Sequence, residues 1–291
     1  MKKLVSSVLV LCMIAVALAG CGNKSTETTK ATEATASTES AVSTEAVSET
    51  QAAEGEAATV QVYIAASLSN AMDEISANYK SVQPNVDLVF NAGSSGKLQT
   101  QIEEGGACDV FFSAATKQMN ALVEGGYVQE ADVTDLLENK VQLIKPAGTE
   151  TKVTGFENIT DAANLALAAD TVPVGQYARE IFDNLGITDQ VMAMEINECE
   201  DVSAVLAAVS EGSNEVGIVY ATDAASVADK VDFIATANDT ELKSKVIYPV
   251  GLVKNTEADD AEVAAAKAFV DYLKTPEAAA VFEKYGFSCI N

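Results

Sequence analysis

The sequence contains no histidine and no tryptophan, and its only arginine is Arg179. Without histidine, Ser-His-Asp and Cys-His catalysis are excluded, and the commonest metal ligand of proteins is missing. Basic residues are few, since 18 Lys and Arg stand against 43 Asp and Glu, giving a formal charge of −25. Such a chain repels phosphate backbones, so nucleic acid is not an expected partner.

Most of the negative charge lies in the part of the chain that is expected to fold. Residues 58–291 carry 14 basic and 36 acidic side chains, a net charge of −22. A solvated acidic surface, which keeps a secreted protein soluble, is the simpler interpretation. A cation-binding protein is the alternative, and it would need converging carboxylates.

The first 21 residues have the pattern of a secretory signal. Lys2 and Lys3 precede an apolar stretch that ends in small residues and is short for a membrane-spanning helix. The tetrapeptide LAGC at 18–21 resembles the cleavage box of bacterial lipoproteins, in which the cysteine becomes the lipidated first residue of the mature chain. We therefore expect secretion across the cytoplasmic membrane and a lipid anchor at Cys21 on its outer face. An ordinary signal with an incidental cysteine is the alternative.

Residues 22–57 are rich in Thr, Ser, Ala and Glu and contain no aromatic side chain. They can bury no apolar face, so we expect a disordered, flexible tether. The cysteines of the remaining chain, Cys108, Cys199 and Cys289, fit no zinc motif. Small buried hydrophobic side chains are their expected role, and a disulfide between two of them stays open.

From residue 58 onwards, predicted strands and helices alternate, which is typical of an α/β protein with a parallel sheet covered on both faces. Arg179 falls on a predicted helix, where a position on the surface is expected. The predicted strands are 60–66, 86–92, 109–114, 141–144, 165–169, 191–196, 216–220 and 246–253. The predicted helices are 67–80, 97–104, 117–124, 174–185, 202–211, 259–273 and 276–285.

Three predicted strand-to-helix junctions carry small polar residues: Ser67, Ser95 and Asp201. Such residues cap helices, and capping alone would explain each of them. In an open parallel sheet, however, helix N-termini gather beyond the carboxyl ends of the strands, and their free N–H groups form an anion site. Together the three junctions indicate a site for a small oxyanion. The segment GSSGKL at 93–98 lacks the spacing of a nucleotide-binding phosphate loop, and an enzyme that uses two distant carboxylates has no positive support.

Taken in order, several segments resemble the molybdate-binding component of ABC importers, the ModA family. They are AASLSNA at 65–71, GSSGKL at 93–98, DVFFSA at 109–114, VPVGQYA at 172–178, EDV at 200–202, GIVY at 217–220 and YPV at 248–250. The resemblance covers 59–291 and implies two α/β lobes, each a mixed, mostly parallel sheet flanked by helices. Two crossing strands, near 141–145 and 245–250, would join them. Lobe one would then be 58–142 plus 246–291, and lobe two 143–245.

The resemblance also implies the ligand-binding groups, namely the hydroxyls of Ser67, Ser95 and Tyr220 and the backbone N–H groups of Val174 and Val202. Val174 stands where the family usually has alanine, a change that a backbone donor tolerates. The implied protein is a monomeric binding protein, not an enzyme, with no cofactor and no direct metal-ion ligand. It would deliver molybdate or tungstate to an ABC permease. Another tetrahedral oxyanion such as sulfate is the alternative, because the sequence does not give the size of the cavity.

Overall fold

The computed structural model describes residues 57–290, which fall within one compact unit. The predicted signal segment, Cys21 and the tether as far as residue 56 lie outside the described residues. No helix within 57–290 is both long enough and apolar enough to cross a membrane.

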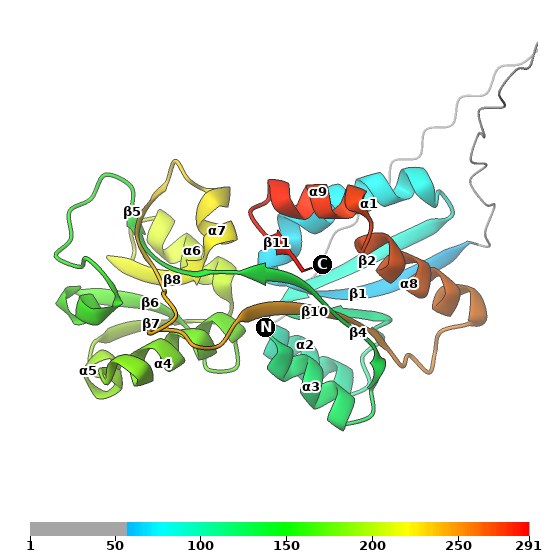
Figure 1. Ribbon diagram of the computed structural model, residues 1–291, viewed down its shortest axis with the longest axis horizontal. Helices are drawn as coiled ribbons and strands as arrows, with labels where there is room; N and C mark the ends of the chain where they lie inside the picture. The colour runs from blue at the N-terminus through cyan, green and yellow to red at the C-terminus, as the bar shows by residue number, and fades with distance from the viewer. Residues whose placement is uncertain (1–56, 291) are drawn as a thin grey trace, which may run out of the picture. The chain divides into compact units, whose positions relative to one another are not determined.

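Within residues 57–290, the strands form two mixed sheets flanked by helices, which confirms the predicted α/β class (Figure 1). The six-stranded sheet has the order β11-β4-β10-β3-β1-β2, and the five-stranded sheet has the order β7-β6-β8-β5-β9. The strands of the first sheet are β1 (Ala58–Ala65), β2 (Val86–Gly93), β3 (Val110–Phe112), β4 (Val128–Asn139), β10 (Val246–Val253) and β11 (Ser288–Cys289). Those of the second are β5 (Val141–Pro146), β6 (Asn164–Ala168), β7 (Glu195–Cys199), β8 (Val216–Tyr220) and β9 (Val231–Thr236).

Each sheet defines one lobe, and most helices of a lobe follow directly after one of its strands. The helices of the first lobe are the 3₁₀ turn η1 (Ala66–Leu68), α1 (Ser69–Val82), α2 (Ser95–Glu103), α3 (Thr116–Glu124), α8 (Asp260–Leu273) and α9 (Pro276–Lys284). Those of the second are the 3₁₀ segment η2 (Phe156–Asp161), α4 (Pro173–Leu185), α5 (Thr188–Met192), α6 (Val202–Ser210) and α7 (Ala221–Ser226).

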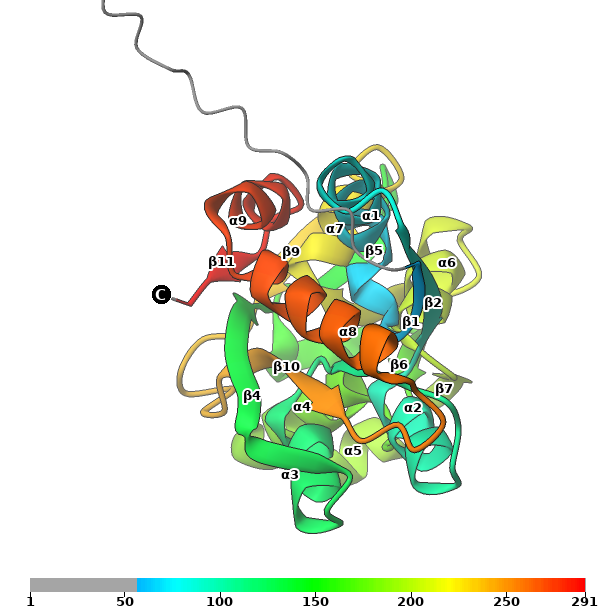
Figure 2. The same cartoon turned by 90° about the vertical axis from the view of Figure 1, so that its right-hand side faces the viewer.

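The first sheet buries both of its faces. Val60, Val62 and Ile64 of β1 join the apolar core that includes residues of α1 and α8, while Tyr63 packs with Leu98 of α2 and its neighbours on the other face. This alternation follows from the two-residue period of a strand. Figure 2 shows α8 on one side of the lobe and α2 and α3 on another.

The parallel strand pairs bring the helix starts together. Strand β1 pairs in parallel with β2 and β3, and β6 pairs in parallel with β7 and β8. The helices that follow β1, β2, β6 and β7 therefore begin at the carboxyl ends of the two sheets. Ligands bind at this edge in open α/β sheets.

The chain passes between the sheets twice. It leaves the first sheet at Asn139 and enters the second at Val141, and it returns between Thr236 and Val246. The two passages lie next to each other, because Val246 is the register partner of Asn139. Short paired connections of this kind form a hinge about which two lobes can close.

Two differences from the predicted elements have physical explanations. The predicted strand at 191–196 is wrong, because Val191 is buried on the short helix α5 and β7 begins only at Glu195. A short apolar run does not distinguish a helix from a strand. The twelve-residue strand β4 was not predicted, since its sequence VQEADVTDLLEN carries many acidic residues and its partner β10 is distant in sequence.

Candidate ligand-binding site

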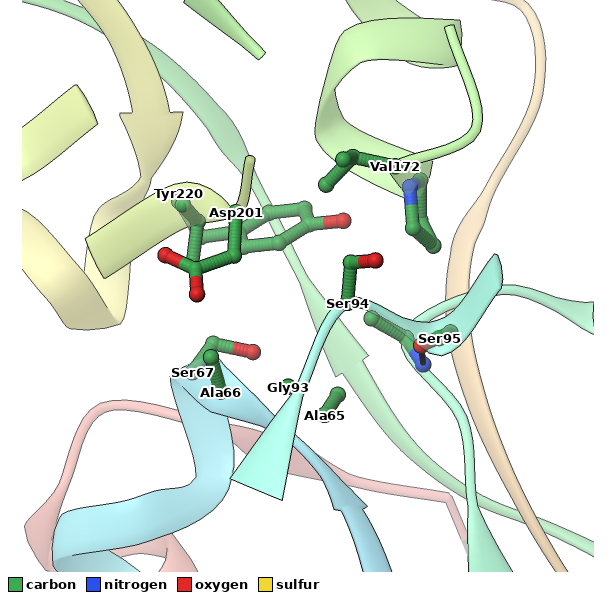
Figure 3. A pocket seen from close by; sticks show the side chains of 12 residues that line it. Ala65, Ala66, Ser67, Gly93, Ser94, Ser95, Val172, Asp201 and Tyr220 are labelled. Carbon is green, nitrogen blue, oxygen red and sulfur yellow. Dashed lines mark hydrogen bonds between the residues drawn. The ribbon is translucent and has the colours of Figure 1, made fainter. Parts of the chain in front are cut away.

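A small cavity lies between the lobes, where the helices begin (Figure 3). Its volume is about 10 Å³, whereas sites for drug-sized ligands have roughly 300–1,000 Å³. The cavity therefore suits only a very small ligand. Lobe one lines it with Ala65, Ala66, Ser67, Gly93, Ser94, Ser95 and Ala114, and lobe two with Val172, Pro173, Asp201, Val202 and Tyr220.

The structure brings most of the sequence-predicted site residues to this cavity. Ser67, Ser95, Val202 and Tyr220 line it, whereas Val174 lies one residue beyond the lining residue Pro173, with its side chain buried in the core. Helix α4 begins at Pro173, which has no N–H group. Val174 therefore carries the first amide of the helix, one of those that have no partner within a helix.

Ser67 lies in the 3₁₀ turn between β1 and α1, and its Oγ is 2.9 Å from the hydroxyl of Tyr248. Asn139 donates its Nδ2 to that hydroxyl at 3.2 Å, while its Oδ1 accepts from the N–H of Lys140 at 2.8 Å. This second bond fixes the orientation of the amide. Of the two groups that contact the buried Tyr248 hydroxyl, only Ser67 Oγ can accept its proton, because Asn139 contacts it through the donor Nδ2. With Tyr248 as the donor, the proton of Ser67 is available to a ligand.

At the start of α2, the hydroxyl oxygens of Ser94 and Ser95 also accept hydrogen bonds from the protein. Ser95 Oγ accepts from the N–H of Ala114 at 3.0 Å, and Ser94 Oγ caps the helix by accepting from the N–H of Lys97 at 3.3 Å. Both residues are buried. Each hydroxyl therefore retains its proton for donation. Ser94 is a site residue that the sequence reasoning missed, because the predicted helix began at residue 97 and the cap position was not recognised.

Tyr220 is only 2 % exposed, and its hydroxyl has no hydrogen-bond partner among the described residues. Burial raises the pKa of this hydroxyl well above its ordinary value, so it remains a donor at neutral pH. The ring packs edge-on against Tyr248 at 5.6 Å between centroids. A buried donor without a partner is costly, and a ligand that accepts from it would remove that cost.

Two features hold α4 against the end of β6. A methyl group at Gly175 would lie 2.2 Å from the carbonyl oxygen of Ala169, so only glycine permits this approach. Nη1 of Arg179 donates to the carbonyl oxygens of Ala168 at 2.9 Å and Gly175 at 2.8 Å. The expected surface position of Arg179 is therefore wrong, since its guanidinium is half-buried and fixes a helix start at the cavity.

The cavity offers neutral donors rather than positive charge. Neither lysine nor arginine lines it, and Asp201 is the one ionisable carboxylate among the lining residues. Its Oδ1 caps α6 by accepting from the N–H of Ala204 at 2.9 Å. Residues 57–290 hold no group of three or more Cys, Asp or Glu side chains placed to bind a metal ion. Cys108, Cys199 and Cys289 are all free, which answers the open question of pairing among them.

Comparisons with known proteins agree with this geometry. The model of the family "Bacterial extracellular solute-binding protein" matches residues 60–288. The chain is 37 % identical over 231 residues to a Bacillus subtilis protein named as an ABC transporter substrate-binding lipoprotein, covering 79 % of this chain and 86 % of that protein. It is 36 % identical over 237 residues to the molybdate-binding protein ModA of Escherichia coli, covering 79 % and 88 %.

A solved structure is similar over the same part of the chain. It is named as the substrate binding domain of a molybdenum ABC transporter from Clostridium difficile, with 34 % identity and a TM-score of 0.61. The match covers 81 % of this chain and 100 % of that one. It confirms the predicted two-lobed fold of periplasmic binding proteins, and the relatives are binding proteins rather than enzymes. The chain belongs to the bacterial extracellular solute-binding proteins and, within them, to the ModA family.

Proposed function

We propose that the protein captures molybdate in the cavity between its lobes and delivers it to an ABC importer. The observation that carries the proposal is the direction of the hydrogen bonds. The oxygens of Ser67, Ser94 and Ser95 all face donors of the protein, and the hydroxyl of Tyr220 has no acceptor among the described residues. The cavity therefore presents protons and suits a ligand that only accepts. The names of the Escherichia coli and Clostridium difficile relatives, a molybdate-binding protein and a domain of a molybdenum transporter, support molybdate as that ligand.

Because the cavity groups donate hydrogen bonds, they favour oxyanions that carry no proton over those that do. Molybdate, tungstate and sulfate carry no proton near neutral pH, whereas phosphate keeps one and needs an acceptor. Asp201 is the lining carboxylate, and one of its oxygens is occupied by the N–H of Ala204. The starts of α2, α4 and α6 supply partial positive charge through their dipoles, so the anion needs no lysine or arginine.

The proposed ligand groups are the hydroxyls of Ser67, Ser95 and Tyr220 and the N–H groups of Val174 and Val202, to which the structure leads us to add Ser94. The proposed lobes are 58–142 plus 246–291 and 143–245. The change of sheet between Asn139 and Val141 supports a boundary near that point.

We further propose that Cys21 carries a lipid anchor outside the cytoplasmic membrane and that tungstate is a second ligand. The LAGC tetrapeptide and the lipoprotein name of the Bacillus subtilis relative support the anchor. Replacement Cys21→Ser should release the protein from the membrane fraction and leave molybdate affinity unchanged. A variant that stayed in the membrane fraction would contradict the anchor.

The experiment that tests the ligand is calorimetric titration of the soluble part, residues 58–291, with molybdate, tungstate, sulfate, phosphate and calcium. We expect molybdate and tungstate to bind tightly, sulfate more weakly, and phosphate and calcium least. Sulfate binding as tight as molybdate would favour a sulfate carrier. Tight binding of calcium alone would restore the cation-binding alternative.

A further inference from the structure

The lobes also touch through helices that take no part in the crossing strands. Gly96 on α2 lies directly against Thr171 of lobe two, and a methyl group at Gly96 would lie 2.1 Å from the carbonyl oxygen of Thr171. Next to it, Lys97 forms an ion pair with Glu200 of lobe two at 2.5 Å. These contacts join the helix that carries Ser94 and Ser95 to the loops that precede α4 and α6.

The backbone of Gly96 gives no local reason for glycine. Gly96 is the second residue of α2 and lies outside the group of glycines with positive φ. In a helix, alanine is more favourable than glycine, so lobe one alone would accept a side chain here. The contact with lobe two is therefore the reason that position 96 requires glycine.

The other crowded glycines differ in this respect. A methyl group at Gly106 would meet Gln101 and Tyr63, one at Gly175 would meet Ala168 and Ala169, and each of these neighbours belongs to the same lobe as the glycine. Among the described residues, Gly96 is the one glycine whose added methyl group would overlap the backbone of the opposite lobe.

The backbone contact outweighs the ion pair beside it. The side chains of Lys97 and Glu200 are 52 % and 70 % exposed, and ion pairs this exposed contribute little in water. A side chain can turn away from a clash with another side chain, but Thr171 presents its carbonyl group. An added methyl group at Gly96 must therefore displace α2 or the Thr171 peptide at the surface where the lobes meet.

We propose that Gly96 determines how far the two lobes close on the bound oxyanion and thereby sets its affinity. The proposal rests on the proposed function, since the ligand used to test it is molybdate. The missing side chain lets the start of α2 reach lobe two, so that donors from both lobes reach one small ion together. Replacement by alanine would keep the donors of each lobe intact and hold the lobes apart.

The test compares wild type with Gly96→Ala and Gly96→Val by calorimetric titration with molybdate and by small-angle X-ray scattering with and without molybdate. We expect affinity to fall roughly 10- to 100-fold for alanine, because overpacking a tight contact is costly, and further for valine. The contraction that molybdate causes in wild type should shrink in the same order. The melting temperature of ligand-free Gly96→Ala should be unchanged or higher, since alanine favours the helix.

Gly155→Ala is the matched control. The three atoms nearest to its methyl group would all belong to the movable carboxylate of Glu157 within lobe two, so affinity and contraction should stay at the wild-type level. Wild-type affinity and full contraction in Gly96→Ala would overturn the inference, and so would a lowered melting temperature without ligand, which would make the glycine structural. Wild type that bound no molybdate would overturn the proposed function and the inference with it.

Discussion

The two lobes meet in one way along the crossing strands and in another way along helix α2. On the strands, Asn139 of β4 donates to Thr222 of lobe two at 3.0 Å and to Tyr248 of β10 at 3.2 Å, and Tyr248 reaches Ser67. Asn139, Tyr248 and Thr222 are all buried, and the groups in these bonds are uncharged. A buried network of this kind fixes the direction of each hydrogen bond.

Along α2, the contacts are a close backbone approach at Gly96 and the exposed ion pair of Lys97 with Glu200. They need no particular orientation of a hydroxyl, and they vanish when the lobes separate. Donor orientation and lobe closure are therefore carried by different residues. Substitutions should therefore affect them separately.

The largest expected effect concerns Asp223, which accepts from the N–H of Tyr220 at 3.1 Å. Burial raises the pKa of this carboxyl from 3.8 to about 7. From pH 4 to 7 the unfolded chain ionises at Asp223 while the folded protein holds the proton, so the wild type loses stability as the pH rises. At about 1.4 kcal/mol per pKa unit, the loss is at most roughly 4 kcal/mol.

Replacement Asp223→Asn removes this loss, so its free energy of unfolding relative to wild type should rise between pH 4 and 7 and then level off. Urea unfolding at several pH values measures it. Asp229→Asn, an exposed carboxylate of the same lobe, is the control. Parallel pH curves for Asp223→Asn and wild type would show that Asp223 ionises alike in both states.

The next largest effect is the loss of molybdate affinity that we expect when a hydroxyl donor of the cavity is removed. Ser67→Ala and Ser95→Ala each remove a hydrogen bond to a charged ligand, worth about 1.5–3 kcal/mol, so molybdate affinity should fall about 10- to 150-fold. Calorimetric titration well below the melting temperature measures it. Ser69→Ala is the control, because its Oγ donates to the carbonyl of Ala66 and does not line the cavity. Both variants binding like Ser69→Ala would mean that the proposed site is wrong.

A smaller loss of molybdate affinity is expected from a change at Tyr248 on the crossing strand β10. Tyr248→Phe removes the hydroxyl that donates to Ser67, so Ser67 is free to turn its proton elsewhere. Affinity should fall about fivefold, since one neutral hydrogen bond contributes about 1 kcal/mol. The matched control is Tyr285→Phe, whose hydroxyl contacts Glu74 within lobe one. Equal molybdate affinities of Tyr248→Phe and Tyr285→Phe would show that Tyr248 does not orient the proton of Ser67.

The smallest effect is expected from the ion pair. Lys97→Ala and Glu200→Gln should each change affinity less than about fivefold, because exposed pairs contribute about 0–1 kcal/mol. The difference from wild type should fade at high salt, whereas wild-type binding itself should depend little on salt. Lys80→Ala, which breaks the pair with Asp87 inside lobe one, is the control. A steep loss of wild-type affinity with salt would indicate a cationic site.

The sequence was informative where its pattern is local. The strands at 86–92 and 216–220 show their apolar character over a few residues, and the structure has them as β2 and β8. Strand β4 was missed because its stability comes from pairing with β10, more than a hundred residues away. Such pairing leaves no local signal.

The same distinction applies to the site. Ser67, Ser95 and Tyr220 were reached through ordered motifs, each of which is a short local segment. The bond from Asn139 to Tyr248 joins residues 109 positions apart, so the proton direction at Ser67 was not accessible from the sequence. Gly96 lay within a recognised segment, but its role depends on Thr171, which only the fold brings near.

The one-way direction of the hydrogen bonds makes the cavity sensitive to the acidity of its ligand. Donors that surround an oxyanion stabilise its deprotonated form, so the pKa of a bound oxyanion falls. Phosphate near neutral pH is a mixture of two protonated ions, so binding of the less protonated ion would release protons to the solvent, unless a proton met Asp201. Molybdate enters with nothing to release. The heat of binding should thus vary with the ionisation enthalpy of the buffer for phosphate and stay constant for molybdate, so that ligands of equal charge and similar shape are distinguished by proton release.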